Sequence, residues 1–236
     1  MESINNANGN VEPAESYLNK GNVLLDQKDY EAAISAYDKA LDLNPNLADA
    51  YFKRGNAKDE IGHYFEAISD YDATIRLDPD AANAYYNRGV SKSKLGHPEA
   101  AISDYNASIR LNPNNANAYN NRGIAKDEIG HYFEAISDYD AAIRLNPNDV
   151  NAYNNRGISK SKLGHPKAAI LDYDAAIRLN PNPVNAYYNR GNAKTKLGLT
   201  DDAKRDFQTA LNLAEKMEDE ELKSKIMKRL EDLETR

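Results

Sequence analysis

Apolar residues recur through most of this chain at the spacing of amphipathic helices. Between residues 132 and 145 they are Ala135, Ile136, Tyr139, Ala142, Ile143 and Leu145. Steps of three and four residues place such a set on one side of a helix. The segment 118–129 comes before it and ends at Gly130, a residue type that favours helix termination. The pattern therefore predicts two helices separated by a short turn.

A proline-containing turn closes the second of these helices. Asn146–Pro147–Asn148 follows the last apolar residue, and proline lacks the helical N–H and disfavours helix in the residue before it. Each helix then has about 13–14 residues and a length of about 20 Å. The two helices are expected to be antiparallel because the turn between them is short. We call the first helix A and the second helix B.

This helix pair is one copy of a repeated unit. The stretch AYNNRGIAKDEIGHYFEAISDYDAAIRLNPN has close copies 34 residues before it and 34 residues after it. Copies, strong or weak, begin at or near Ala14, Ala50, Ala84, Ala118, Ala152 and Ala186. A period of this length indicates stacked helix pairs rather than one globular core. We refer to residues at the same place in successive repeats as a column.

The repeat period also predicts where the chain divides. The expected repeats span residues 14–47, 48–81, 82–115, 116–149, 150–183 and 184–217. Residues 1–13 are polar and rich in asparagine, so we expect a disordered tail there. Residues 218–236 carry an apolar stripe at Leu222, Ile226, Leu230 and Leu233. We expect a capping helix there, because a stacked array needs a polar-backed last helix.

A glycine recurs in the middle of helix A, at Gly89, Gly123 and Gly157 among others. Glycine in a helix costs about 1 kcal/mol relative to alanine. A cost that is kept in every copy indicates that a large side chain lies against this position. The tyrosine of helix B is the expected neighbour, at Tyr105, Tyr139 and Tyr173.

Composition narrows the picture by exclusion. The chain has 236 residues, no cysteine and a formal net charge of −7, so disulfides and cysteine metal sites are excluded. The acidic balance argues against nucleic-acid binding, which needs a basic surface. No apolar run approaches the roughly 18 residues of a membrane span, and the first residues lack the features of a secretory signal. We therefore expect a cytoplasmic protein that binds neither nucleic acid nor membrane.

Histidine is the one residue type that suggests a metal site. One histidine follows the turn glycine in each of four repeats, at His63, His97, His131 and His165. Packed helices are about 10 Å apart and a zinc–nitrogen bond is about 2 Å long, so neighbouring histidines cannot readily share an ion. No catalytic triad or carboxylate pair stands apart from the repeat pattern. We expect turn residues, no metal, no cofactor and no enzymatic activity.

The repeated residues match a known family pattern. In the fourth repeat the matching aromatic, glycine, alanine and proline positions are Tyr119, Gly123, Ala135, Tyr139, Ala142 and Pro147. Residues 14–217 resemble an array of tetratricopeptide repeats, and the YYNRG style resembles bacterial, particularly cyanobacterial-type, members. The resemblance implies an all-α, right-handed superhelical solenoid of six helix-turn-helix repeats with a C-terminal capping helix.

Two columns of helix A depart from the family pattern, an arginine just before the mid-helix glycine and a lysine three residues after it, at Lys58, Lys92, Lys126, Lys160 and Lys194. Repeats 2–6 carry Arg54, Arg88, Arg122, Arg156 and Arg190 in helix A. The same repeats carry an aspartate just before the helix-B aromatic residue, at Asp70, Asp104, Asp138, Asp172 and Asp206. Repeat 1 has Lys20, Leu24 and Ala36 in these three places, so all three columns change together. We expect each arginine to form a charge-assisted pair with an aspartate of a neighbouring helix.

Two asparagine columns lie four residues apart in helix A and therefore share one helix face. The first column is Asn83, Asn117, Asn151 and Asn185, and the second is Asn87, Asn121, Asn155 and Asn189, with Asn19 opening it. Lys53 interrupts the second column. The first column could assist helix initiation, and the second could be a copied neutral motif. The family resemblance implies instead a concave groove lined by helices A, in which the second-column asparagines clamp an extended peptide backbone.

Aromatic and charged residues extend this candidate site. Phe52, Tyr86 and Tyr188 are of the type that anchors interfaces. Lys94, Glu128 and Lys162 fall in one column, where acidic and basic repeats alternate. This alternation suits a partner with charges of both signs or a second copy of the chain, while a merely solvated face explains it equally well. The basic residues of the family's clamp for heat-shock protein tails are absent.

We therefore expect a non-catalytic protein–protein scaffold that binds an extended peptide or a partner helix of unknown identity in the groove. The alternative is a self-assembling, structural or designed array in which the same surfaces make a homo-oligomer. Near-identity of repeats 2 and 4, and of repeats 3 and 5, indicates duplication of a pair of repeats.

Overall fold

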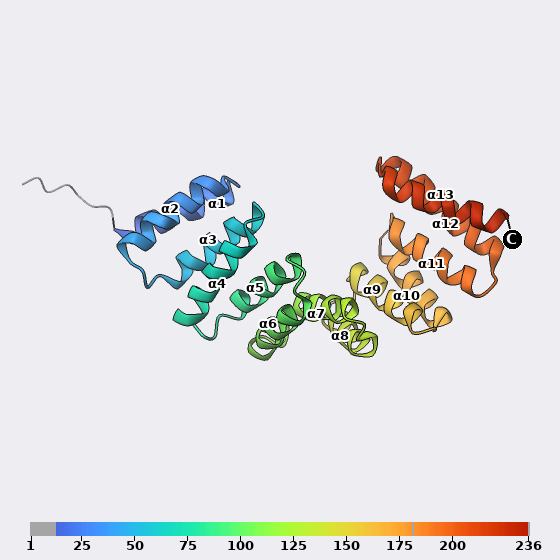
Figure 1. Ribbon diagram of the computed structural model, residues 1–236, viewed down its shortest axis with the longest axis horizontal. Coiled ribbons are helices and arrows are strands. Elements are labelled where there is room, and N and C mark those ends of the chain that lie inside the picture. The colour runs from blue at the N-terminus through green and yellow to red at the C-terminus, as the bar shows by residue number, and fades with distance from the viewer. Residues whose placement is uncertain (1–12, 181, 236) are drawn as a thin grey trace, which may run out of the picture. The chain divides into compact units, whose positions relative to one another are not determined.

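The computed structural model describes residues 13–180 and 182–235, and within these ranges the chain forms thirteen α-helices and no strand (Figure 1). In chain order they are α1 (Ala14–Asp26), α2 (Tyr30–Leu43), α3 (Ala48–Glu60), α4 (Tyr64–Leu77), α5 (Ala82–Lys94), α6 (Pro98–Leu111), α7 (Ala116–Glu128), α8 (Tyr132–Leu145), α9 (Val150–Lys162), α10 (Pro166–Leu179), α11 (Val184–Lys196), α12 (Thr200–Lys216) and α13 (Glu220–Glu234). The predicted all-α series of helix pairs is confirmed. Apart from Pro13, the tail expected at residues 1–13 lies outside the described residues.

The chain divides into two compact units, of which the first ends at Leu111 and the second begins at Asn112. The first unit contains α1–α6 and the second contains α7–α13. Within each unit every helix packs against the next one in the chain (Figure 1). Odd-numbered helices from α1 to α11 are helices A, and even-numbered ones from α2 to α12 are helices B. Among the described helices, none has the length and apolar character that crossing a membrane requires.

Glycine turns end the helices A of repeats 2–6, as the sequence predicts, whereas in repeat 1 the positive φ, 61°, belongs to Lys28. Gly62 has a φ of +82° and Gly130 a φ of +80°, a left-handed conformation that only glycine adopts without a steric cost. Helix B then begins at once, with His63 and His131 at the N-cap positions of α4 and α8. The histidines therefore lie in the turns. The short turn holds the two helices of a repeat antiparallel and in contact.

Close contact between helix A and helix B depends on the mid-helix glycine. A Cβ atom placed on Gly89 would lie 2.8 Å from Cε1 of Tyr105, and one on Gly123 would lie 2.7 Å from Cε1 of Tyr139. Both tyrosines are buried. The expected packing of the helix-B tyrosine on the glycine is confirmed, and the sixth repeat uses Phe207 in the same way against Gly191.

A buried aspartate joins the helices electrostatically. Asp172 on α10 accepts hydrogen bonds from Nε and Nη2 of Arg156 at 3.1 and 2.6 Å, and from Nζ of Lys160 at 2.8 Å. Nη1 of Arg156 also donates to Asp140 on the preceding helix B at 2.6 Å. The predicted arginine–aspartate pair is confirmed in repeats 2–6, at Arg54–Asp70, Arg88–Asp104, Arg122–Asp138, Arg156–Asp172 and Arg190–Asp206. The contacts of the lysine and of the second aspartate with this pair were not predicted.

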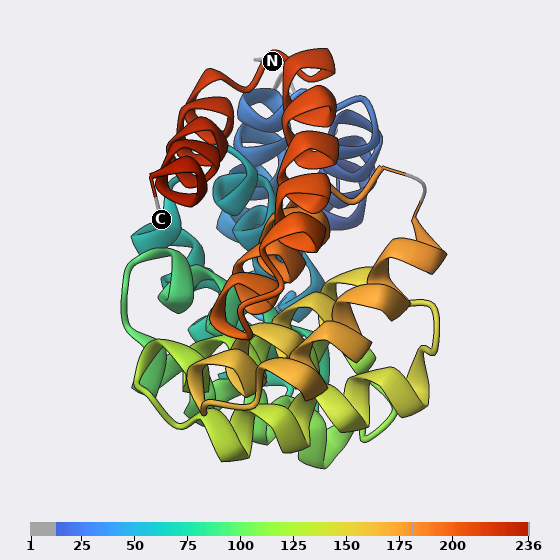
Figure 2. The same ribbon diagram turned by 90° about the vertical axis from the view of Figure 1, so that its right-hand side faces the viewer.

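The last two helices close the second unit. Ile226 and Leu233 of α13 are buried in a cluster with Phe207 and Ala210 of α12 and Val184 of α11. Figure 2 shows α12 and α13 in its orange-red and dark red ribbons. The apolar stripe of α13 thus covers the last helix pair, while its other side carries charged residues.

Candidate partner-binding face

The exposed side of helices A carries both asparagine columns, and we call it the helix-A face. Asn83, Asn117, Asn151 and Asn185 of the first column are all exposed. Each is the second residue of its helix, whereas the N-caps with side-chain bonds are Asn115 of α7 and Asp149 of α9. The first column therefore does not supply the capping bonds at these two helices.

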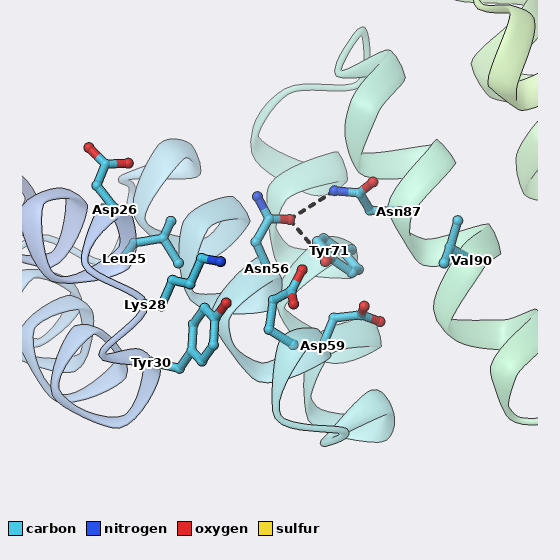
Figure 3. A pocket seen from close by; sticks show the side chains of 10 residues that line it. Leu25, Asp26, Lys28, Tyr30, Asn56, Asp59, Tyr71, Asn87 and Val90 are labelled. Atoms are coloured by element: carbon cyan, nitrogen blue, oxygen red, sulfur yellow. Dashed lines mark hydrogen bonds between the residues drawn. The ribbon is translucent and has the colours of Figure 1, made fainter. Parts of the chain in front are cut away.

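Second-column asparagines are half-buried and contact the preceding repeat. Nδ2 of Asn87 donates to Oδ1 of Asn56 at 2.8 Å, and that oxygen also accepts the hydroxyl of Tyr71 at 3.0 Å (Figure 3). In the second unit, Nδ2 of Asn155 donates to Asn120 at 3.4 Å, and Nδ2 of Asn189 donates to Asn154 at 3.1 Å. Asn121 is also half-buried, and Asn19 is exposed on α1.

These bonds identify asparagines that the sequence analysis missed. Asn56, Asn120 and Asn154 hold second-column side chains across a repeat junction. Asn56 lies in a different column from Asn120 and Asn154. A comparison of columns within one repeat does not reveal such contacts. The spacings of 31 and 35 residues would have done so, because they join one helix A to the next.

The three predicted aromatic anchors are half-buried and pack inward. The ring of Phe52 lies 6.1 Å from that of Tyr71, measured between centroids. The Tyr86–Tyr105 and Tyr188–Phe207 distances are 6.0 and 5.9 Å. These edge-tilted contacts are typical of aromatic pairs in a core. Each anchor therefore presents only part of its ring on the helix-A face.

The alternating charges are partly used inside the protein. Lys94 is exposed, but its Nζ lies 2.6 Å from Oδ2 of Asp59 in the preceding helix A. Oδ1 of that aspartate accepts the hydroxyl of buried Ser91 at 2.7 Å. The sequence analysis assigned Lys94 to a partner, and the structure pairs it with its own chain. Glu128 and Lys162 are exposed at the ends of α7 and α9.

The second unit contains a similar contact. Ser159 donates to both carboxylate oxygens of Asp127 at 2.8 and 2.7 Å, and Tyr139 donates to Oδ2 at 3.1 Å. The serine column could have revealed this contact in the sequence. Serine occurs in this column at Ser91 and Ser159, in the repeats that directly follow those of Asp59 and Asp127. In repeats 2, 4 and 6 the same column holds alanine. This co-variation follows the two-repeat period of the sequence.

The half-buried carboxyl of Asp127 allows a prediction about how the free energy of unfolding depends on pH. Burial raises the pKa of its carboxyl above the ordinary 3.8, while the bonds from Ser159 and Tyr139 and the charge of Lys162 offset part of that rise. The folded state therefore binds this proton more tightly than the unfolded state. We expect the free energy of unfolding of the parent, relative to the non-titrating variant Asp127→Asn, to rise as pH falls from about 7 to about 4.

Urea unfolding of both proteins at each pH measures this difference. A carboxyl NMR titration of the parent should place the Asp127 midpoint above 3.8. A stability difference that is flat, or that moves in favour of the variant on acidification, contradicts the assignment.

Three cavities in the described part of the chain open on or beside helices A. The first, of about 420 Å³, is lined by Asn56, Asn87 and Val90 among others (Figure 3). The second, of about 410 Å³, lies among α11, α12 and α13, with Lys196 and Phe207 in its wall. The third, of about 220 Å³, includes Asn151 and Asn185. Predicted site residues thus line the first and third cavities.

Models of one repeat family match most of the chain. A model described as "TPR repeat" matches residues 21–62, 60–96, 127–164 and 162–198. Three models described as "Tetratricopeptide repeat" match residues 82–115, 105–137 and 184–217. Because these matches extend over more than half of the sequence, the chain belongs to the tetratricopeptide-repeat family.

Solved structures give the same result. The chain is similar to the crystal structure of MamA, with 28% identity and a TM-score of 0.67 over 72% of this chain and 93% of MamA. It is also similar to YrrB, described as "a TPR protein with an unusual peptide-binding site", with 28% identity and a TM-score of 0.67 over 75% of this chain and 91% of YrrB. A tetratricopeptide repeat protein from Parabacteroides merdae shares the fold over 94% of this chain and 87% of its own, with 22% identity and a TM-score of 0.67. No curated protein matches the chain.

These comparisons support a protein-interaction scaffold. Proteins of this family are typically non-catalytic, and their repeats present surfaces to other proteins.

Proposed function

We propose that this protein is a non-catalytic scaffold that binds an extended segment of a partner protein, or a partner helix, along the helix-A face. The observation that carries the proposal is the second asparagine column. Asn87, Asn155 and Asn189 are half-buried, and each is held by a hydrogen bond that it donates to an asparagine of the preceding repeat.

Such side chains suit a peptide backbone. An amide offers two N–H donors and an acceptor oxygen, so one bond to the preceding repeat does not exhaust it. A bond that fixes the side chain also lowers the entropy that a partner must remove on binding. The exposed first-column asparagines lie one helical turn away and provide further amides on the same face. YrrB, a relative at 28% identity, is itself described as having a peptide-binding site.

The test is a peptide array screened with the parent and with the triple variant Asn87→Ala, Asn155→Ala, Asn189→Ala. We expect the variant to lose about tenfold or more in affinity for peptides that bind the parent, because several backbone contacts of about 1 kcal/mol are removed. A matched control changes three exposed loop asparagines, Asn46, Asn114 and Asn148, to alanine. Equal binding by both triple variants contradicts the proposal.

The molar mass, measured by light scattering over roughly a hundredfold concentration range, separates this proposal from self-assembly. A constant monomer mass supports a face that is open to a partner. A mass that rises with concentration, and that falls in the triple variant but not in its control, favours the homo-oligomer instead.

A further inference from the structure

Two repeat junctions place a lysine ammonium over a tyrosine ring and near a carboxylate of the preceding repeat. Nζ of Lys94 lies 2.6 Å from Oδ2 of Asp59. The same atom lies 4.8 Å from the centroid of the Tyr64 ring. In the second unit, Nζ of Lys162 lies 4.9 Å from the centroid of the Tyr132 ring, and its charge acts on Asp127. In both cases the ring and the acid belong to the repeat before the lysine. The fold therefore builds an ammonium site from a tyrosine that begins helix B and a carboxylate near the end of helix A.

The junction between repeats 1 and 2 has the ring but lacks the lysine. Tyr30 occupies the column of Tyr64 and likewise begins its helix B. Glu60 occupies the column of Lys94, and Leu25 occupies the column of Asp59. At this junction the carboxylate therefore belongs to Glu60 of the second repeat rather than to the first repeat. The column that holds Lys94 and Lys162 at the later junctions supplies no ammonium here.

A cavity of about 420 Å³ lies at this junction, and both Tyr30 and Glu60 line it. Figure 3 shows Leu25, Lys28 and Tyr30 on one side, from α1, the turn that follows it and the start of α2, and Asn56 and Asp59 of α3 on the other. The entire cavity lies within the first unit.

The charges around this cavity favour a cation. Three carboxylates line it, those of Asp26, Asp59 and Glu60, against the single ammonium of Lys28. Asp59 is already paired with Lys94. Within the described part of the chain, neither Asp26 nor Glu60 takes part in an ion pair with a lysine or arginine. Leu25 adds an apolar wall of the kind against which the methylene groups of a long basic side chain pack.

We propose that this cavity binds the ammonium group of a lysine side chain that is carried by the partner segment. The guest takes the place that Lys94 and Lys162 occupy at the later junctions, with its ammonium between the Tyr30 ring and the Glu60 carboxylate. This inference rests on the proposed function and adds to it the residue type that the first two repeats recognise.

The direct test is an NMR titration of the isotope-labelled protein with Nα-acetyl-lysine N-methylamide as probe. Amide shifts are expected near Tyr30 and Glu60. Nα-acetyl-norleucine N-methylamide, which has the methylenes but no charge, should bind about fivefold more weakly or worse. Glu60→Gln should weaken the lysine probe by about fivefold. Glu60→Lys should abolish binding, because it restores the internal lysine of the other junctions.

Glu134→Gln is the control, since Glu134 is an exposed carboxylate of α8 in the second unit and does not line this cavity. It should leave probe binding at the first junction unchanged. Equal binding of the lysine and norleucine probes overturns the proposal, as does an unchanged affinity in Glu60→Gln. Binding of the capped arginine analogue as tightly as the lysine probe overturns the selectivity for lysine.

Peptides from the array separate failure of this inference from failure of the proposed function. Replacement of a lysine by norleucine should weaken a bound peptide about fivefold with the parent and have little effect with Glu60→Lys. Peptides that bind and ignore both changes leave the scaffold function standing and overturn the lysine site. An array without any binding contradicts the function, while the probe titration still reports on the cavity.

Discussion

Asp172→Ala is expected to lower the free energy of unfolding by about 3 kcal/mol. The side chain is only 5% exposed, and it accepts hydrogen bonds from Arg156 and Lys160. Removal of the carboxylate leaves two cations facing each other at a half-buried position without their shared counter-ion. Because the arginine and lysine keep about a fifth of their surface exposed, the expected loss is at the lower end for a broken buried pair.

Asp140→Ala provides the comparison, because Asp140 contacts the same Arg156 from the preceding helix B. Its side chain is 47% exposed, so its loss should cost less than about 1 kcal/mol. Urea unfolding followed by circular dichroism measures both, and amide hydrogen exchange should locate the loss of Asp172 in α9 and α10. Equal effects of the two variants would show that burial does not govern the strength of this network.

Repeat 1 supplies a second comparison within the same chain. There the three columns hold Lys20, Leu24 and Ala36. A variant with Arg156→Lys, Lys160→Leu and Asp172→Ala copies that combination into repeat 5. It should recover most of the stability lost in Asp172→Ala, since removal of a whole buried charge group costs less than removal of one member. A further loss in the triple variant would contradict this account.

The sequence predicts the helix pairs well because each packing column is copied in every repeat. Gly123 and Tyr139 were expected in contact from their recurrence alone, and the structure places them so. The Arg156–Asp172 pair was also predicted, because both columns change together in repeat 1. The contacts of Lys160 and Asp140 with this pair were not predicted. Asp140 belongs to the preceding repeat, and a pattern within one repeat does not show which neighbour a long side chain reaches.

The helix-A face was harder to predict for the same reason. From the sequence, Lys94 is expected to contact solvent or a partner. In the structure, helix stacking brings Asp59 within 2.6 Å of it. From the sequence, Phe52 is expected to be an interface anchor. In the structure, its ring packs against Tyr71. At the first junction, where the cavity lies, Leu25 stands in the column of the Asp59 carboxylate and Glu60 stands in the column of the Lys94 ammonium. Such a feature follows from contacts across a junction, which the identity of a single residue does not determine.

Gly157→Ala is expected to destabilise the protein by about 2 kcal/mol, although the same change in an open helix stabilises by about 1 kcal/mol. The new Cβ would lie 2.6 Å from Cε1 and 3.0 Å from Cζ of Tyr173, which is only 2% exposed. The contact is too short to be kept, and the ring is enclosed, so α9 and α10 must separate or the ring must leave its rotamer. Urea unfolding measures the sign, which is the informative quantity.

The sign should reverse when the ring is removed. In a Tyr173→Leu background, Gly157→Ala should be neutral or stabilising, because the helix gains its propensity without meeting an aromatic edge. Gly191→Ala tests the role of the hydroxyl, since a Cβ on Gly191 would lie 2.7 Å from Cε1 of Phe207, an equivalent ring without the oxygen. A loss there equal to that at Gly157 assigns the cost to the ring alone. If instead Gly157→Ala stabilises the parent, the close approach of helix A to helix B does not explain why this chain keeps six mid-helix glycines.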